Sequence, residues 1–442
     1  MSSSIKDIYS DYYNKSRRFV ASNRMGDSAH AVSESFSMEA RDDGLYKSVA
    51  GVEKRDVSVD NDFDIQRKLR RGFGKTGVNT NKIGGHPDFD TLASTGDTQR
   101  GYVTTLFIDI KNSTKLGVIY EPEMVFSIKN GIIKCAIETI LAFDGHVHRI
   151  MGDAVLAFFR SGERPENSAI NAINCAVCLV KFIEDVVSPG LKQQDIDPVG
   201  IRIGIDYGDD DSVLWGMYGY HGASEVTATS FHVDVAAKLQ QAASKNKIMI
   251  GDSLKRLIDI PSHYLNVRSD SDRYVKPNYS DESGKQICYK QFELKNEDYF
   301  KLLPLDNSSG LNMIPYLDND FYVAMSITDS KGSPSQEKYY PCGSFVYKKR
   351  YVKFKVYFTD ANFANYKVRY RVENNGLDAR LAEPENNGNH ETFVDAVHQG
   401  AGSYLAVQIE PTAYLGLHYM YISVYKNDSL YMKEKKIGVY VA

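Results

Sequence analysis

The chain has 442 residues, of which 42% are hydrophobic and 25% are charged, and its formal net charge is −4. This length is typical of about three domains with substantial cores. The net charge argues against a broadly basic surface for nucleic acid, and no apolar run is long enough to span a bilayer. The polar start of the chain lacks the apolar core of a signal peptide, so we expect a cytoplasmic protein with no membrane or nucleic-acid partner.

The cysteines and one histidine pair do not predict a disulfide framework or a metal centre. Cys175 and Cys178 lie in a helical pattern that has no second ligand pair at useful spacing, so we interpret them as core residues. His146 and His148 share one face of a predicted strand, but a zinc site would need more ligands. The complete scattered set is Cys135, Cys175, Cys178, Cys288 and Cys342.

Composition divides the chain into three regions. Residues 1–97 are polar with short apolar clusters, and we expect only partial order there. Residues 98–300 alternate between strand-like and helix-like patterns. Residues 310–442 contain short alternating segments separated by Asn-, Gly- and Asp-rich clusters, which predicts an all-β, immunoglobulin-like sandwich.

The middle region predicts a ferredoxin-like α/β core. Helical spacing covers 125–143, 169–187 and 231–243, and strand patterns cover 101–110, 146–151, 154–159, 200–207, 213–218 and 247–250. We expect a hairpin through Gly152 and Asp153, and a second strand pair formed by 200–207 and 213–218. This β-α-β-β-α-β order places Asp109 and Asp153 at strand ends.

Asp109 and Asp153 are the first candidate site residues. Each alone is an ordinary turn or cap residue. Two carboxylates that converge beside a helix start are what a metal-bound triphosphate requires, because hard divalent cations prefer oxygen ligands. The backbone N–H groups of Asn112, Ser113 and Thr114 follow Asp109 and could cradle phosphate oxygens.

Four segments resemble the successive motifs of class III nucleotide cyclases. They are FIDIKNST, GHVHRIMGDAVLAFF, VGIRIGIDYG and EVTATSFHVDVAAKLQQAA, within residues 101–258. The resemblance implies that Asp109, Asp153 and the Ile110 carbonyl hold two Mg²⁺ or Mn²⁺ ions, which activate the 3′-hydroxyl for attack on the α-phosphorus and release of pyrophosphate. It also implies a head-to-tail homodimer whose sites combine residues from both chains.

The resemblance also implies roles for three further residues. Thr227 matches the position that contacts the base. Asp234 and Lys238 stand where the family usually has Asn for the ribose and Arg for the transition state, and they are four residues apart on one helical face. Lysine keeps the positive charge of arginine but cannot donate two parallel hydrogen bonds as a guanidinium does. A slower enzyme, an altered substrate pose and an inactive domain are therefore all compatible with Lys238. The triphosphate-binding lysine is not identified, and Lys285 is a guess.

Tyr102 and Arg149 resemble the pattern of the Pycsar pyrimidine cyclases, which make cyclic UMP or cyclic CMP in bacterial antiphage defence. A bulky Tyr102 would shrink a purine-sized pocket, and Arg149 offers only donors. Uracil presents two carbonyl acceptors, whereas the cytosine amino group needs an acceptor, so we expect a uridylate cyclase acting on UTP. CTP and ATP remain alternative substrates, and a catalytically silent nucleotide-binding sensor is the alternative of another class.

The C-terminal region carries a second resemblance. The segments VENNGLDA and TAYLGLHYMYISVY look like the sensor domain attached to adenylyl/guanylyl cyclases and to related defence nucleotidyltransferases. This resemblance implies an enzyme that responds to a phage-derived activator. Its cyclic-nucleotide product would then act on a downstream effector.

Overall fold

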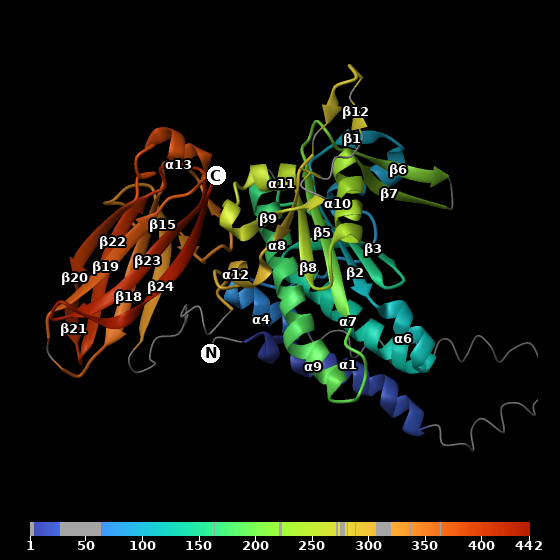
Figure 1. Cartoon of the computed structure of the whole chain (residues 1–442), viewed down its shortest axis with the longest axis horizontal. Helices are drawn as coiled ribbons and strands as arrows, with labels where there is room; N and C mark the ends of the chain where they lie inside the picture. Colours follow the sequence, from blue (N-terminus) through green and yellow to red (C-terminus); the bar gives the residue numbers. More distant parts are fainter. Residues whose placement is uncertain are drawn as a thin grey trace, which may run out of the picture.

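A seven-stranded sheet lies at the centre of the computed structural model (Figure 1). The structure describes residues 4–26, 63–162, 164–220, 223–270, 273–274, 279–280, 282–287, 289–305, 320–335, 337–362 and 364–442. The sheet order is β3 (Gly145–Met151), β4 (Ala154–Phe159), β2 (Val103–Lys111), β5 (Gly200–Gly208), β8 (Lys247–Gly251), β14 (Gln291–Leu294) and β9 (Leu265–Val267). The predicted β-α-β-β-α-β order is confirmed by β2, β3, β4 and β5, with helices between β2 and β3 and between β4 and β5.

Helices cover both faces of this sheet (Figure 1). Leu106, Ile108 and Ile110 of β2 are buried toward α7 (Pro122–Ala142) and α8 (Pro165–Phe182), whose apolar residues share one core with them. Successive side chains of a strand point to opposite faces. Asp109 therefore points to the other face, against which α10 (Phe231–Ala242) packs.

α10 approaches β5 so closely that only glycine fits at position 204. A Cβ at Gly204 would overlap the carbonyl oxygen of Ala236 and the amide nitrogen of Gln240, which are rigid backbone atoms of α10. The helix that carries Asp234 and Lys238 is thus fixed to the central strand by direct backbone contact.

Replacing Gly204 with alanine is expected to lower the free energy of unfolding by about 1–3 kcal/mol, because overpacking forces the helix away from the sheet. Chemical denaturation followed by circular dichroism measures this loss. Gly117 in α6 (Ser113–Ile119) is the matched control, since a Cβ there meets nothing within 4 Å. An equal loss in Gly117→Ala and Gly204→Ala would contradict the close approach as the cause.

Helices from the first 97 residues add to the core. Ile8, Tyr9 and Tyr13 of α1 (Ile5–Gly26) are buried against α7 and α8, and the Tyr9 hydroxyl lies 2.8 Å from Thr139 Oγ1. The other elements of this stretch are α4 (Asp64–Gly72), η1 (Pro87–Phe89) and α5 (Leu92–Thr95). Helical spacing in the sequence did not predict α1 or α4, and residues 27–62 lie outside the described part.

A separate three-stranded sheet projects beside the central one (Figure 1). It consists of β1 (Thr98–Arg100), β6 (Leu214–Tyr220) and β7 (Ala223–Thr229). The predicted pairing of 213–218 with 200–207 is wrong, because β2 and β8 occupy both edges of β5 and leave none for β6. We call the β6–β7 hairpin the arm.

Short elements complete the middle region. They are η2 (Ile183–Val187), α9 (Ser188–Lys192), α11 (Asp252–Leu257), η3 (Ser262–Tyr264), β10 (Ser269–Asp270), β11 (Arg273–Tyr274), β12 (Tyr279–Ser280), β13 (Gln286–Ile287) and α12 (Asn296–Phe300). In the part of the chain that the structure describes, no helix is both long enough and apolar enough to cross a bilayer.

The C-terminal region is a sandwich of two five-stranded sheets. One has the order β16 (Glu337–Tyr339), β15 (Phe321–Thr328), β18 (Tyr351–Thr359), β22 (Ser403–Pro411), β21 (Val397–Gly400). The other has the order β17 (Phe345–Val346), β24 (Ser429–Val441), β23 (Gly416–Lys426), β19 (Tyr366–Glu373), β20 (His390–Asp395), and α13 (Gly376–Ala382) follows β19. The all-β prediction is confirmed, and the immunoglobulin-like type remains a prediction.

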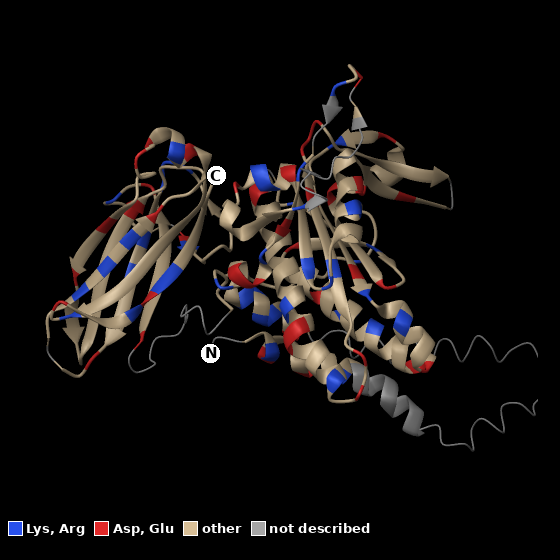
Figure 2. Ribbon diagram, viewed as in Figure 1, with Lys and Arg blue, Asp and Glu red and all other residues tan. Residues whose placement is uncertain are grey.

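The sandwich and the central domain share a buried junction. The Tyr299 hydroxyl of α12 lies 3.1 Å from the Tyr440 hydroxyl of β24 and donates to Asn174 Oδ1 at 3.1 Å. Asn174 of α8 donates in turn to the Cys342 carbonyl at 2.8 Å. Lys and Arg residues lie among Asp and Glu residues over both parts (Figure 2), so the surface charge is mixed. Buried hydrogen bonds therefore join the two parts.

Candidate active site

The structure brings Asp109 and Asp153 together at one end of the central sheet. The last residue pair between β2 and β4 is Asp109 with Ala154, and Ala154 directly follows Asp153. The Ile110 N–H donates to the Asp153 carbonyl at 3.2 Å, which ties the β3–β4 turn to the end of β2. The two side chains are 18% and 28% exposed, so a ligand can reach both. The two residues are therefore neighbours at one end of the sheet within a single chain, and their convergence on a shared metal stays a prediction.

Each carboxylate has a cation beside it. Arg202 faces Asp109 across the β2–β5 ladder, and its Nε donates to Asp109 Oδ2 at 3.0 Å while Nη2 contacts the same oxygen. Lys129 of α7 has its Nζ 3.9 Å from Asp153 Oδ2. Sequence reasoning missed Arg202, although it is the one charged side chain between the apolar residues of GIRIGI.

The donor chemistry fits a divalent cation. Two carboxylates and a neighbouring backbone carbonyl at Ile110 are hard oxygen donors, which Mg²⁺ and Mn²⁺ prefer. Among the described residues, no group of three or more His, Cys, Asp and Glu side chains is arranged to hold a metal. Two protein carboxylates match the usual mode for Mg²⁺, in which one or two carboxylates and the substrate phosphates share the ion.

The loop after β2 supports Asp153. Asn112 adopts a left-handed conformation with φ of 70°, and α6 begins at the next residue. The Ser113 hydroxyl donates to Asp153 Oδ2, so this side chain orients the carboxylate. Asn112 and Thr114 are exposed beside it. Phosphate binding by their backbone N–H groups stays a prediction.

Arg149 lies against the arm, beside the predicted base contact Thr227. Its guanidinium Nη2 forms an ion pair with Glu225 Oε1 of β7. Thr227 stands two residues further along β7 and therefore on the same face as Glu225. His148 Nε2 lies 3.9 Å from the other Glu225 oxygen. Sequence reasoning missed Glu225, which gives this site both a donor and an acceptor.

Tyr102 does not join Arg149 within the chain. Arg149 is level with Leu156 and Phe107 in the sheet. The five residue steps from Tyr102 to Phe107 therefore separate Tyr102 from Arg149 by about 16 Å in the strand direction. Tyr102 is only 4% exposed, and its hydroxyl donates to the Gly162 carbonyl at 2.8 Å. The Arg160 guanidinium lies 4.4 Å from the centre of its ring. These contacts hold the ring under the end of β4, so it does not narrow a pocket at Arg149.

Asp234 and Lys238 lie on the exposed face of α10. The helix begins after Ser230, whose hydroxyl accepts the His232 N–H at 3.1 Å. At its other end, Arg202 Nη1 donates to the Gln241 carbonyl at 3.4 Å, which links α10 to the Asp109 end of the sheet. Lys285 is exposed in the turn before β13, and its predicted role stays a guess.

The other candidate ligands from the sequence are packing residues. His146 Nε2 and His148 Nδ1 each lie 2.9 Å from the Gly84 carbonyl oxygen, and burial lowers the pKa of both rings. Both therefore favour the neutral form near pH 7. The described cysteines, Cys135, Cys175, Cys178 and Cys342, are free and buried, and Cys288 lies outside the described residues.

Two family models match consecutive parts of the chain. The adenylate and guanylate cyclase catalytic domain matches residues 97–290, and the adenylyl/guanylyl and SMODS C-terminal sensor domain matches residues 302–442. The first match contains both aspartates, Arg149, Arg202 and α10. The protein is thus a nucleotide cyclase, which cyclises a nucleoside triphosphate, and its family typically depends on divalent metal ions.

Relatives extend the likeness over nearly the whole chain. A cytidylate cyclase from Escherichia coli is 39% identical over 92% of this chain and 89% of its own length. A cytidylate cyclase from Staphylococcus aureus is 34% identical over 85% of this chain and 87% of its own. The chain belongs to the Pycsar-type class III cyclases with a C-terminal sensor domain. The adenylyl cyclase CyaB from P. aeruginosa covers 45% of this chain and 95% of its own, with a TM-score of 0.37 and 22% identity.

Proposed function

We propose that the protein is a cytidylate cyclase that converts CTP to 3′,5′-cyclic CMP and pyrophosphate. Three relatives of the chain are cytidylate cyclases, which supports this substrate over UTP. The ion pair of Arg149 with Glu225 is the structural observation that carries the proposal. The expected preference for UTP assumed a base site with donors alone, and Glu225 supplies the acceptor that the cytosine amino group needs.

Arg149 and Glu225 would read the base as a pair. The guanidinium donates to O2 or N3 of cytosine, and the carboxylate accepts from the 4-amino group. Because Glu225 already holds Arg149, the pair is formed before the base arrives, which limits the entropy lost on binding. Glu225 can also accept from uracil N3–H, so UTP is the competitor that the experiment must separate.

Asp109, Asp153 and the Ile110 carbonyl would hold Mg²⁺ or Mn²⁺. When bound, such ions lower the pKa of the 3′-hydroxyl and neutralise phosphate charge. Arg202, which contacts Asp109, would supply a positive charge beside this site. Lys238 offers a positive charge to the phosphorane-like transition state, and Asp234 offers an acceptor to a ribose hydroxyl.

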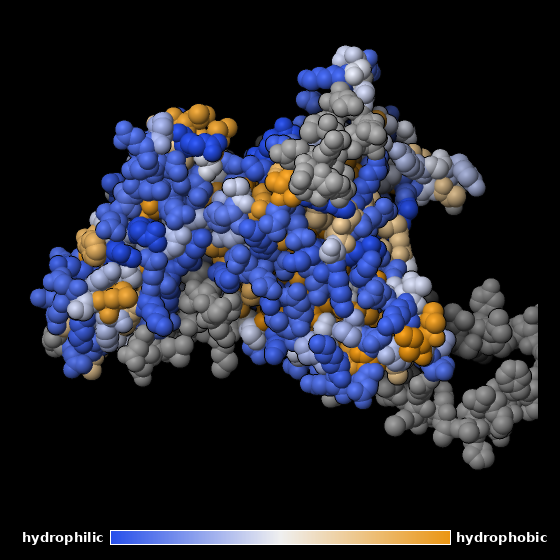
Figure 3. Space-filling view, in the orientation of Figure 1, coloured by the Kyte–Doolittle hydropathy of each residue, from blue (hydrophilic) through white to orange (hydrophobic). Residues whose placement is uncertain are grey.

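We further propose a homodimer in which α10 of one chain faces the aspartates of the other. Asp234 and Lys238 are exposed on α10, an outward position that suits residues acting in a partner's site. Large apolar side chains are also exposed on the arm, where Met217, Tyr218 and Tyr220 are 37%, 54% and 76% exposed. Figure 3 shows a second apolar group over α6, where Val118 is 83% exposed. Surfaces of this kind commonly mark protein contacts.

The substrate is tested with all four ribonucleoside triphosphates, each with Mn²⁺ and with Mg²⁺, and products identified by mass spectrometry. We expect cyclic CMP to predominate. Predominant cyclic UMP would favour the uridylate alternative, and a purine product would remove the pyrimidine assignment. No product under any condition would favour the silent nucleotide-binding sensor.

Glu225→Gln tests whether the Arg149–Glu225 pair reads the base. The amide keeps the size of the side chain but loses the ion pair, so we expect kcat/KM for CTP to fall by about 10–100-fold, which corresponds to about 1.4–2.7 kcal/mol. Glu337→Gln, at an exposed sensor-domain position, should leave kcat/KM unchanged. If Glu225→Gln keeps both the rate with CTP and the wild-type preference, the base is read elsewhere.

A further inference from the structure

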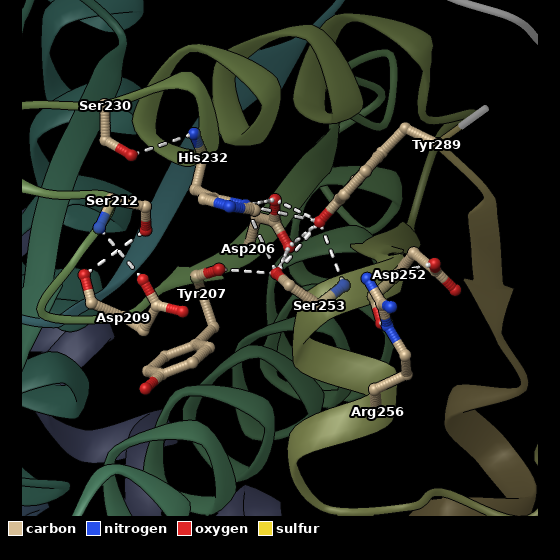
Figure 4. A network of polar contacts seen from close by, with 10 residues as sticks. All are labelled: Asp206, Tyr207, Asp209, Ser212, Ser230, His232, Asp252, Ser253, Arg256 and Tyr289. Atoms are coloured by element: carbon tan, nitrogen blue, oxygen red, sulfur yellow. Dashed lines mark hydrogen bonds and ion pairs between the residues drawn. The ribbon is translucent and has the colours of Figure 1, made fainter. Parts of the chain in front are cut away.

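A buried carboxylate holds four segments together at the start of α10 (Figure 4). Asp206, near the end of β5, is fully buried. The Tyr289 hydroxyl lies 2.8 and 2.6 Å from its two carboxylate oxygens, the Ser253 hydroxyl donates to Oδ1 at 2.8 Å, and His232 Nδ1 lies 2.9 Å from Oδ2. We call these four residues the Asp206 cluster. Every donor within it converges on one carboxylate.

The geometry excludes a nucleophilic triad. His232 reaches both Asp206 and Ser253 through the same nitrogen, Nδ1, at 2.9 and 3.3 Å. A triad needs the two imidazole nitrogens to contact the acid and the nucleophile separately. The Ser253 hydroxyl has two acceptors for its single proton, Asp206 Oδ1 and the Tyr207 carbonyl, and neither of them is His232. The cluster therefore holds elements in place.

The elements that it holds include the helix with the proposed transition-state residues. His232 lies in the first turn of α10, two residues before Asp234 and six before Lys238. Ser253 belongs to α11, and Tyr289 precedes β14. A Cβ at Gly251 would overlap the Asp206 carboxylate, so β8 is also pressed against the cluster. The cluster therefore contacts the first turn of α10 directly.

The segment after α11 contacts the sensor domain. Asp259 Oδ2 accepts the Leu377 N–H of α13 at 3.0 Å, and Asp259 Oδ1 lies 3.2 Å from Lys255 Nζ of α11. A cavity of about 750 Å³ opens between α11 and α13, and Lys255, Asp259 and Leu377 all line it. The helix α11 thus begins at the Asp206 cluster, and Asp259, just after its end, contacts the sensor domain.

We infer that the Asp206 cluster positions Asp234 and Lys238 for cyclisation, and that the sensor domain sets this position through α11. The inference rests on the proposed roles of Asp234 and Lys238. It identifies Ser253, His232 and Tyr289 as positioning residues, since they act through α10. Misplacement of a reacting group by about 1 Å can cost a hundred-fold in rate without loss of substrate binding.

The first test removes single hydroxyls from the full-length protein. Tyr289→Phe and Ser253→Ala should each lower kcat with CTP at least five-fold and leave KM within two-fold. Hydrogen exchange of the α10 amides, which needs no substrate, should become faster in both variants. Tyr370→Phe and Ser423→Ala are matched controls, because these hydroxyls are buried without a hydrogen-bond partner among the described residues. Ser253→Thr keeps a hydroxyl and should recover part of kcat.

These measurements decide whether the Asp206 cluster positions Asp234 and Lys238. Unchanged kcat in Tyr289→Phe and Ser253→Ala overturns it. Lower kcat with a lower unfolding temperature and unchanged α10 exchange also overturns it, since the cluster would then be merely structural. If the wild type makes no cyclic nucleotide, the proposed function fails, and α10 exchange in Tyr289→Phe still decides whether the cluster positions the helix.

The second test concerns the sensor domain. Asp259→Ala should change kcat at least three-fold at constant KM, and this effect should shrink in the Ser253→Ala background because the signal passes through Ser253. Asp378→Ala is the control, since Asp378 lines the same cavity but pairs with Lys348 and the Leu415 N–H inside the sensor domain. Additive effects, or equal effects of Asp259→Ala and Asp378→Ala, would overturn the sensor route.

Discussion

Asp109→Asn and Asp153→Asn are each expected to reduce cyclic nucleotide formation below about a tenth of the wild-type rate, because either change removes a charged oxygen ligand from the metal site. The fold should persist, since both side chains lie at strand ends and are partly exposed. Product formation with Mn²⁺ gives the rate, and calorimetric titration with Mn²⁺ in the presence of a non-hydrolysable nucleotide gives the loss of metal affinity.

Arg202 makes the choice of substitution important. Alanine at position 109 would leave the guanidinium beside β2 without its carboxylate, whereas asparagine keeps an oxygen acceptor for it. Asp197→Asn is the control, because Asp197 forms an exposed ion pair with Lys115. A folded Asp109→Asn or Asp153→Asn enzyme with more than a tenth of wild-type activity would remove that residue from the metal site.

Mixing Asp109→Asn protein with Lys238→Ala protein is expected to restore activity that neither has alone. If each site takes its aspartates from one chain and Lys238 from the other, a mixed dimer holds one intact site and one doubly defective site. Random exchange at equal amounts makes half of the dimers mixed, so activity should reach about a quarter of the wild-type value. Product formation before and after subunit exchange measures the recovery.

A mixture of Asp109→Asn with Asp153→Asn is the control for this result. Both defects lie in the aspartate half of the site, so every dimer contains two broken sites and no activity should return. Recovery in this control would contradict the proposed arrangement, because it would require a site that takes Asp109 from one chain and Asp153 from the other. Continued inactivity of the first mixture, with exchange demonstrated by native mass spectrometry, would contradict the shared site.

The sequence alone determined the central sheet and its aspartate pair. Helical and strand periodicity are local properties, so the order of β2, α7, β3, β4, α8 and β5 follows from the apolar pattern. The meeting of Asp109 and Asp153 follows from the same pattern, because Asp153 lies in a hairpin turn and Asp109 ends a strand beside that hairpin. The family motifs then supplied the chemistry of the pair.

Only the tertiary structure decided the contacts between distant segments. Arg202 meets Asp109 because the β2–β5 register aligns them, and Glu225 meets Arg149 because β6 pairs with β1 and β7. Tyr102 lies away from the base site because it stands five residue positions along the chain from Phe107, which is level with Arg149. The Asp206 cluster draws on four segments, and no periodicity specifies which polar side chain of one meets another. Sheet order and strand register set these contacts, and both are chosen by packing of the whole chain.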